Sequence, residues 1–211
     1  MSARRSNGGR RGRRLGTDRS TRYIVYLAIV AVVGAIVGVV VLTSPFSGDG
    51  RPSSAAPVAD YPYPVQMFAP DAGGRSHFPV GQTYDNYNSN PPTSGPHTAA
   101  ANWGINNVAV PKEAAVHNME HAGVVIWYNC NGGTQPLSAA DCTQLRADLS
   151  GVVSQAIQAS KPVLMTPYPE MTNRIALTAW QFLDAFDTFD QARVQMFIDT
   201  FVCHTDLEGF C

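Results

Sequence analysis

The hydrophobic pattern of the chain opens with one long apolar run. Residues 23–43 read YIVYLAIVAVVGAIVGVVVLT and contain no charged side chain. A helix of this length rises about 32 Å, which is enough to cross a bilayer core of about 30 Å. We therefore predict a transmembrane helix over 23–43.

The pattern changes twice after the apolar run. Residues 44–65 are rich in Pro, Ser and Ala, which predicts an extended stalk. Residues 66–112 lack clear periodicity and are dense in turn-forming residues. Within them, residues 84–97 combine aromatic side chains with Asn, Pro and Gly, and we expect an ordered, packed loop there.

The C-terminal half has regular patterns that alternate between strand and helix. Apolar, β-branched runs predict three strands, and apolar positions at helical spacing predict two helices, the first capped by a serine. In chain order these elements are a strand at 122–129, a helix at 138–159, strands at 162–168 and 174–180, and a helix at 189–204. The order β-α-β-β-α predicts an α+β domain, with a small sheet and two main helices on one face.

The charge of the chain is unevenly distributed and predicts the topology. Residues 1–22 hold eight arginines and one acidic residue, whereas the remaining residues carry a net charge of -8. The positive-inside rule places this basic, disordered tail in the cytoplasm and residues 66–211 outside the cell membrane. The apolar run is not followed by a small-x-small cleavage site, so we expect a single-pass, uncleaved anchor.

This topology also bears on the partners of the protein. The lipid bilayer is the first expected partner, and other membrane or envelope proteins are further candidates. The acidic folded part argues against binding of nucleic acid.

The cysteines are the first candidates for defined chemistry. All four follow the apolar run, and an even number in an oxidising compartment predicts disulfides. Of the three pairings that four cysteines allow, we favour the two local ones, Cys130–Cys142 and Cys203–Cys211. A zinc site made of four thiolates is the alternative, but the sequence has no CxxC spacing to support it.

A histidine motif is the most informative local pattern. His117 and His121 are four residues apart, so they share one face of a helix, and they share one face of a strand together with Met119. His97, in the preceding loop, is a candidate third ligand. The hypothesis is a copper or zinc site with His97, His117, His121 and Met119 as ligands and Glu120 as a supporting group or base.

Two other functions compete with metal binding. In a non-catalytic interaction domain, the histidines would be structural, and the loop at 84–97 would contact an envelope or membrane partner. In a metal-dependent hydrolase, His117-x-x-Glu120-His121 would match the inverted zinc-peptidase pattern with Glu120 as base. We expect only about one turn of helix before Gly123, and no other catalytic motif is present, so a binding protein is favoured over an enzyme.

Three blocks of sequence resemble one bacterial family. They are NSNPPTSGPH at 88–97, VHNMEHAGVVIWY at 116–128 and RIALTAW at 174–180. Together they resemble the DUF3105 family, whose members have one N-terminal span, an extracytoplasmic domain and no known function. The resemblance implies a domain over roughly 70–205 and points to His97, His117, Glu120 and His121 as positions to test. It implies no reaction. The family usually has Gly where this chain has Ala122.

Overall fold

The computed structural model describes residues 58 and 60–211. The predicted tail, the predicted transmembrane helix and most of the predicted stalk lie outside the described residues. Among the helices of the described part, none has the length and apolar character needed to cross a membrane.

A mixed six-stranded sheet forms the centre of the domain, with strand order β1-β6-β5-β3-β4-β2. Its middle consists of the three predicted strands, β3 (Val124–Tyr128), β4 (Val163–Pro167) and β5 (Ile175–Ala179). β3 pairs parallel with β4 and antiparallel with β5. The predicted α+β class is confirmed.

Three strands were not predicted from the sequence. β6 (Phe182–Phe186) pairs antiparallel with β5, and β1 (Gln66–Met67) and β2 (Gly104–Ile105) lie at the two edges. β6 was missed because a buried aspartate, Asp184, interrupts its apolar pattern. The guanidinium of Arg193 donates to both oxygens of this carboxylate, which stabilises its charge inside the protein.

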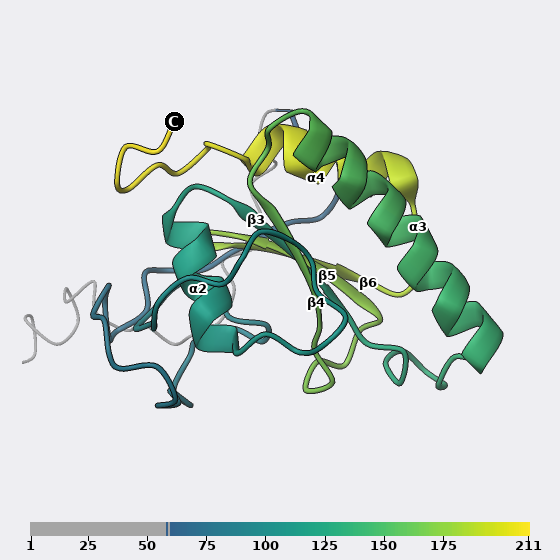
Figure 1. Ribbon diagram of the computed structural model, residues 1–211, viewed down its shortest axis with the longest axis horizontal. Helices are drawn as coiled ribbons and strands as arrows, with labels where there is room; N and C mark the ends of the chain where they lie inside the picture. Colours follow the sequence, from purple (N-terminus) through teal and green to yellow (C-terminus); the bar gives the residue numbers. More distant parts are fainter. Residues whose placement is uncertain (1–57, 59) are drawn as a thin grey trace, which may run out of the picture. The chain divides into compact units, whose positions relative to one another are not determined.

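Helices cover both faces of the sheet (Figure 1). α3 (Ala139–Gln158) and α4 (Gln191–Phe201) pack on one face, as predicted, whereas α2 (Lys112–Glu120) packs on the other. The expectation that helices lie on one face only is therefore wrong, as is the expectation of a single helical turn before Gly123. All five residues of β3 are buried because both faces are covered.

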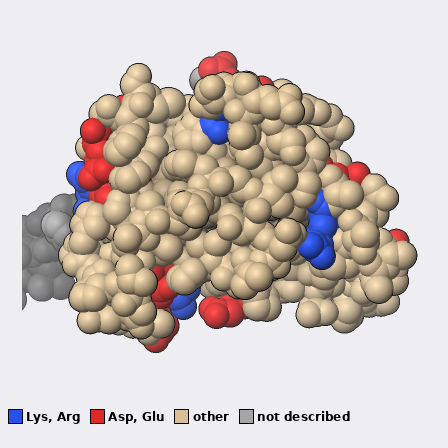
Figure 2. All heavy atoms as spheres, viewed as in Figure 1, with Lys and Arg blue, Asp and Glu red and all other residues tan. Residues whose placement is uncertain are grey.

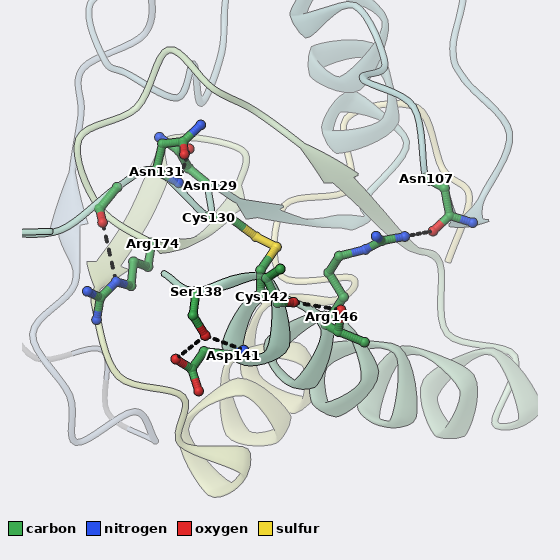
Figure 3. Close-up of a disulfide and its surroundings, with 12 residues drawn as sticks. Asn107, Asn129, Cys130, Asn131, Ser138, Asp141, Cys142, Arg146 and Arg174 are labelled. Carbon is green, nitrogen blue, oxygen red and sulfur yellow. Dashed lines mark hydrogen bonds between the residues drawn. A yellow bond between two sulfur atoms is a disulfide. The ribbon is translucent and has the colours of Figure 1, made fainter. Parts of the chain in front are cut away.

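Both predicted disulfides are present, and no cysteine is free. Cys130–Cys142 joins the end of β3 to the first turn of α3 (Figure 3). At the start of that helix, the Ser138 hydroxyl accepts a hydrogen bond of 3.1 Å from the N–H of Asp141, which is the predicted N-cap. The four-thiolate zinc site is thereby excluded.

Charged side chains are sparse on the face shown in Figure 2, where they form a few small patches, some with basic and acidic groups side by side. No broad basic surface is seen on this face. The expectation that the domain binds no nucleic acid stays a prediction.

The packed domain begins before residue 66, the boundary expected from the sequence. Tyr61 and Val65, in the last part of the predicted stalk, are buried in the core on the α3 and α4 side of the sheet. The Tyr61 hydroxyl also donates a hydrogen bond to the carboxylate of Asp184. This segment is part of the fold rather than a spacer.

We expect Tyr61→Ala to lower the free energy of unfolding by about 3–5 kcal/mol, because it removes a large buried ring and leaves a cavity. Asp60→Ala, at an exposed neighbouring position, should change it by less than about 0.5 kcal/mol. Urea denaturation followed by circular dichroism measures both. Equal unfolding midpoints for the two variants would show that this segment is not part of the cooperative unit.

Candidate metal centre

The end of α2 lies inside the histidine motif. α2 stops at Glu120, and the N–H groups of Ala122 and Gly123 donate to the carbonyls of Met119 and Asn118 over 3.1 and 3.2 Å. This pair of bonds is a Schellman closure, which places Ala122 in the left-handed region with φ of 61°. Ala122, where the family usually has Gly, therefore occupies a position at which glycine is preferred.

Met119 is not among the ligands that the structure brings together. Its side chain is fully buried in the apolar core between α2 and the sheet. At about 100° per residue, it is turned about 200° around the helix from His117. Met119 would have shared a face with the histidines only on a strand, and the backbone here is helical. We therefore correct the sequence hypothesis and exclude Met119.

Four side chains converge where α2 meets the loop that precedes it. His77, His97, His117 and Glu120 each offer one ligand atom, and these atoms all lie within 4.8 Å of one another. The Nε2 atom of His97 is 2.7 Å from Oε2 of Glu120 and 3.1 Å from Nε2 of His77. Ligands around one tetrahedral ion at about 2.0–2.1 Å would be about 3.3 Å apart. The cluster has the dimensions of a metal site.

Two backbone carbonyls determine which ring nitrogen of His97 and of His117 is free. Nδ1 of His97 lies 2.8 Å from the Gly95 oxygen, and Nδ1 of His117 lies 2.5 Å from the Thr98 oxygen. A carbonyl can only accept, so Nδ1 carries the hydrogen in both rings. Nε2 of a neutral ring then carries a lone pair. Metal-binding histidines commonly donate their other N–H in this way.

The neutral form of His97 follows from its surroundings. Its side chain is fully buried, and burial lowers its pKa more than the Gly95 carbonyl and the Glu120 charge raise it. In its neutral form the ring presents the Nε2 lone pair to Glu120.

Glu120 is a fully buried carboxylate with one unpartnered oxygen. Burial raises the pKa of this carboxyl, whereas the hydrogen bond from Arg75, the charge of Arg75 and the neighbouring imidazoles lower it, and the net shift is downward, so the carboxyl is ionised at neutral pH. Arg75 donates to Oε1, whereas Oε2 accepts no hydrogen bond from any described residue. Oε2 and the lone pair of His97 thus face each other at 2.7 Å. Two such acceptors repel unless a cation lies between them.

His77 was missed by the sequence analysis because no spacing relates it to the motif. The backbone places it: the N–H of His97 donates to the Ser76 carbonyl and the N–H of Phe78 to the His97 carbonyl, both over 3.0 Å. The side chain of His77 is 51% exposed, so it forms the open side of the cluster. The signal in the sequence was that histidine is rare, with five in the chain, and the structure shows that four of them gather here.

His121 lies beside this cluster, next to the C-terminal residues. Its Nε2 is 2.9 Å from Nε2 of His117 and 3.0 Å from Oε2 of Glu208. Burial lowers the pKa of His121, and His117 lowers it further, although Glu208 opposes the shift. His117 thus lies between two groups of ligand atoms, one with His97 and one with His121 and Glu208, and His97 and His121 do not share a group.

The fold and the site define an α+β domain that carries a cluster of histidines and carboxylates. A family model described as "Protein of unknown function (DUF3105)" matches residues 80–209. The chain belongs to the DUF3105 family, as the three sequence blocks indicated. Neither a curated protein nor a solved structure matches the chain.

Asn118 ties the loop before β2 to α2 and thereby helps to hold the motif. Its side chain is fully buried, its amide donates to the Ala101 carbonyl over 3.0 Å, and its oxygen accepts from the Ala101 N–H over 2.9 Å. Removing it would leave both backbone groups without these partners.

We expect Asn118→Ala to lower the free energy of unfolding by about 2–4 kcal/mol, since two polar backbone groups lose their partner. Asn106→Ala is the matched control, because that side chain makes only hydrogen bonds of 3.3–3.5 Å near the surface. Thermal and urea unfolding compare the two. A loss at Asn118 no larger than at Asn106 would contradict this assignment.

Proposed function

We propose that this domain binds a divalent transition-metal ion through His97 and Glu120, with His77 completing the ligand set and His117 beside it. The observation that carries the proposal is the unpartnered, buried Oε2 of Glu120, which faces the lone pair of His97. A bound cation satisfies both atoms at once. A proton shared between the two atoms would satisfy them as well, and metal retention by the wild type separates the two cases.

The donor atoms favour particular ions. Imidazole nitrogen and carboxylate oxygen suit zinc(II) and copper(II), whereas copper(I) prefers sulfur. The four cysteines form disulfides, and Met119 lies in the core, so the cluster contains no sulfur ligand. Of the two metals expected from the sequence, both remain candidates in their divalent state.

The contacts of Glu120 favour a ligand over a catalytic base. The side chain has no exposed surface, one oxygen is held by Arg75, and the other is directed at His97. A base that activates water needs access to that water. The interaction-domain alternative expects histidines that hydrogen-bond Glu120, and it requires a proton on Nε2 of His97, 2.7 Å from Oε2.

We also propose that the metal is handled outside the cell, on a domain anchored by residues 23–43. The apolar run and the preceding arginines support this topology. The two disulfides support it independently, because such bonds persist in oxidising compartments.

Zinc retention by the full-length protein tests the metal site. We expect the wild type to retain zinc after gel filtration. His97→Ala and Glu120→Gln should each lower the zinc affinity of this site more than about 100-fold, because mutating even a group that only supports a ligand lowers metal affinity about 10–100-fold. Met119→Leu keeps the volume of the core and should retain zinc. Elemental analysis and competition with a chromophoric chelator measure these effects. A wild type that retains neither zinc nor copper would overturn the proposal.

The topology is tested with single introduced cysteines and a membrane-impermeant maleimide. We expect Thr134→Cys, at an exposed position of the domain, to be labelled in intact cells. Ser6→Cys, in the arginine-rich tail, should be labelled only after the cells are lysed. The reverse pattern would place the domain inside the cell.

A further inference from the structure

The last nine residues form a compact loop. The Cys203–Cys211 disulfide closes it, with the two Cα atoms 5.9 Å apart. Inside the loop, the carboxylate of Asp206 accepts hydrogen bonds of 2.8–3.0 Å from the N–H groups of Gly209, Phe210 and Cys211. The loop therefore has a defined conformation of its own.

This loop is docked on the end of α2, and Figure 1 shows the C-terminal segment running back towards that helix. The N–H of Cys203 donates to the Ala122 carbonyl over 2.9 Å. The ring of Phe210 stacks on His121 with centroids 4.1 Å apart, and Oε2 of Glu208 lies 3.0 Å from Nε2 of His121. The loop thus delivers a carboxylate to the histidine motif.

The delivered carboxylate completes a second set of ligand atoms. Those of His117, His121 and Glu208 lie within 4.8 Å of one another. His117 also belongs to the inner cluster, but its Nδ1 donates to a carbonyl, so only Nε2 is free, and one lone pair binds one ion. Nε2 of His121 lies only 2.9 Å from this atom.

The six side chains therefore divide into two sets of equal composition. His77, His97 and Glu120 form the inner set, and His117, His121 and Glu208 form the outer set. Two histidines and one glutamate are a known set of ligands for zinc with an open position. His121 also lines a cavity of about 330 Å³, together with Trp103 and Phe210.

We propose that His117, His121 and Glu208 bind a second divalent transition-metal ion, and that this outer site exists only while the Cys203–Cys211 disulfide holds Glu208 in place. The proposal rests on the proposed function, because it adds an ion to the same histidine cluster. Arg75 contacts Glu120 and also lies 3.6 Å from Glu208. The positive charge of an ion at the inner site weakens the binding of a second ion at the outer site.

Zinc titration of the full-length protein, followed by calorimetry and elemental analysis, tests the outer site. We expect two equivalents in the wild type, with the second bound at least 10-fold more weakly. His121→Ala and Glu208→Gln should each bind one equivalent with the affinity of the tight site. Cys203→Ser/Cys211→Ser should do the same, and this pair avoids reductants and free thiols, which bind zinc themselves. Cys130→Ser/Cys142→Ser is the matched control and should keep two.

The outcomes separate this proposal from the one on which it rests. A wild type that binds neither zinc nor copper(II) overturns both. If the wild type binds one equivalent and Glu208→Gln leaves its affinity unchanged, the outer site alone is overturned. If the wild type binds one equivalent and Glu208→Gln weakens it, a single ion lies among all six side chains, and the outer site is overturned as well. Two equivalents in Cys203→Ser/Cys211→Ser contradict the dependence on the disulfide. Urea unfolding of each variant shows that the fold persists.

Discussion

A carboxylate oxygen without a hydrogen-bond donor lies at the point where α2, the loop that precedes it and the histidine rings meet. Oε2 of Glu120 is buried, without a hydrogen-bond donor, and 2.7 Å from Nε2 of His97. An arrangement of this kind costs free energy unless a positive charge completes it. Arg75 supplies such a charge to the other oxygen, Oε1, and leaves Oε2 for something else. This single constraint connects the fold to the proposed chemistry.

The fold holds Glu120 and the histidine rings around it in place. α2 covers the face of the sheet that α3 and α4 leave open, and the apolar residues of the helix, with Met119 among them, pack into that face. The opposite side of the helix then carries His117 towards the loop. Carbonyls of Gly95 and Thr98, on either side of His97, orient the two inner rings. The PPTSGPH and HNMEH blocks thus act together as one site.

The sequence predicted the elements whose patterns are local. α3 and the strands β3, β4 and β5 followed from periodicity and capping, and the disulfides followed from proximity along the chain. β6 was missed because Asp184 is buried against Arg193, a contact that no spacing reveals. α2 was underestimated because Gly123 appeared to stop it too soon. With α2 taken as helical, the same spacing that joined His117 and His121 would have excluded Met119.

The site was only partly predictable for the same reason. His97, His117, His121 and Glu120 belong to blocks with recognisable patterns. His97, His117 and Glu120 meet in one group, and His121 lies next to His117 in a second. His77 and Glu208 come from irregular segments on either side, and only tertiary contacts place them. The backbone bridge to His97 positions the first, and the Cys203–Cys211 loop positions the second. His77 lies 3.7 Å from Glu120, and Glu208 lies 3.6 Å from Arg75, so both residues adjoin the same ion pair.

X-ray absorption at the zinc edge, on the zinc-loaded full-length protein, tests the central claim most directly. The account predicts nitrogen and oxygen neighbours at about 2.0–2.1 Å, the multiple scattering of imidazole rings, and no sulfur at about 2.3 Å. A shell that contains sulfur, or oxygen neighbours without imidazole, would contradict it.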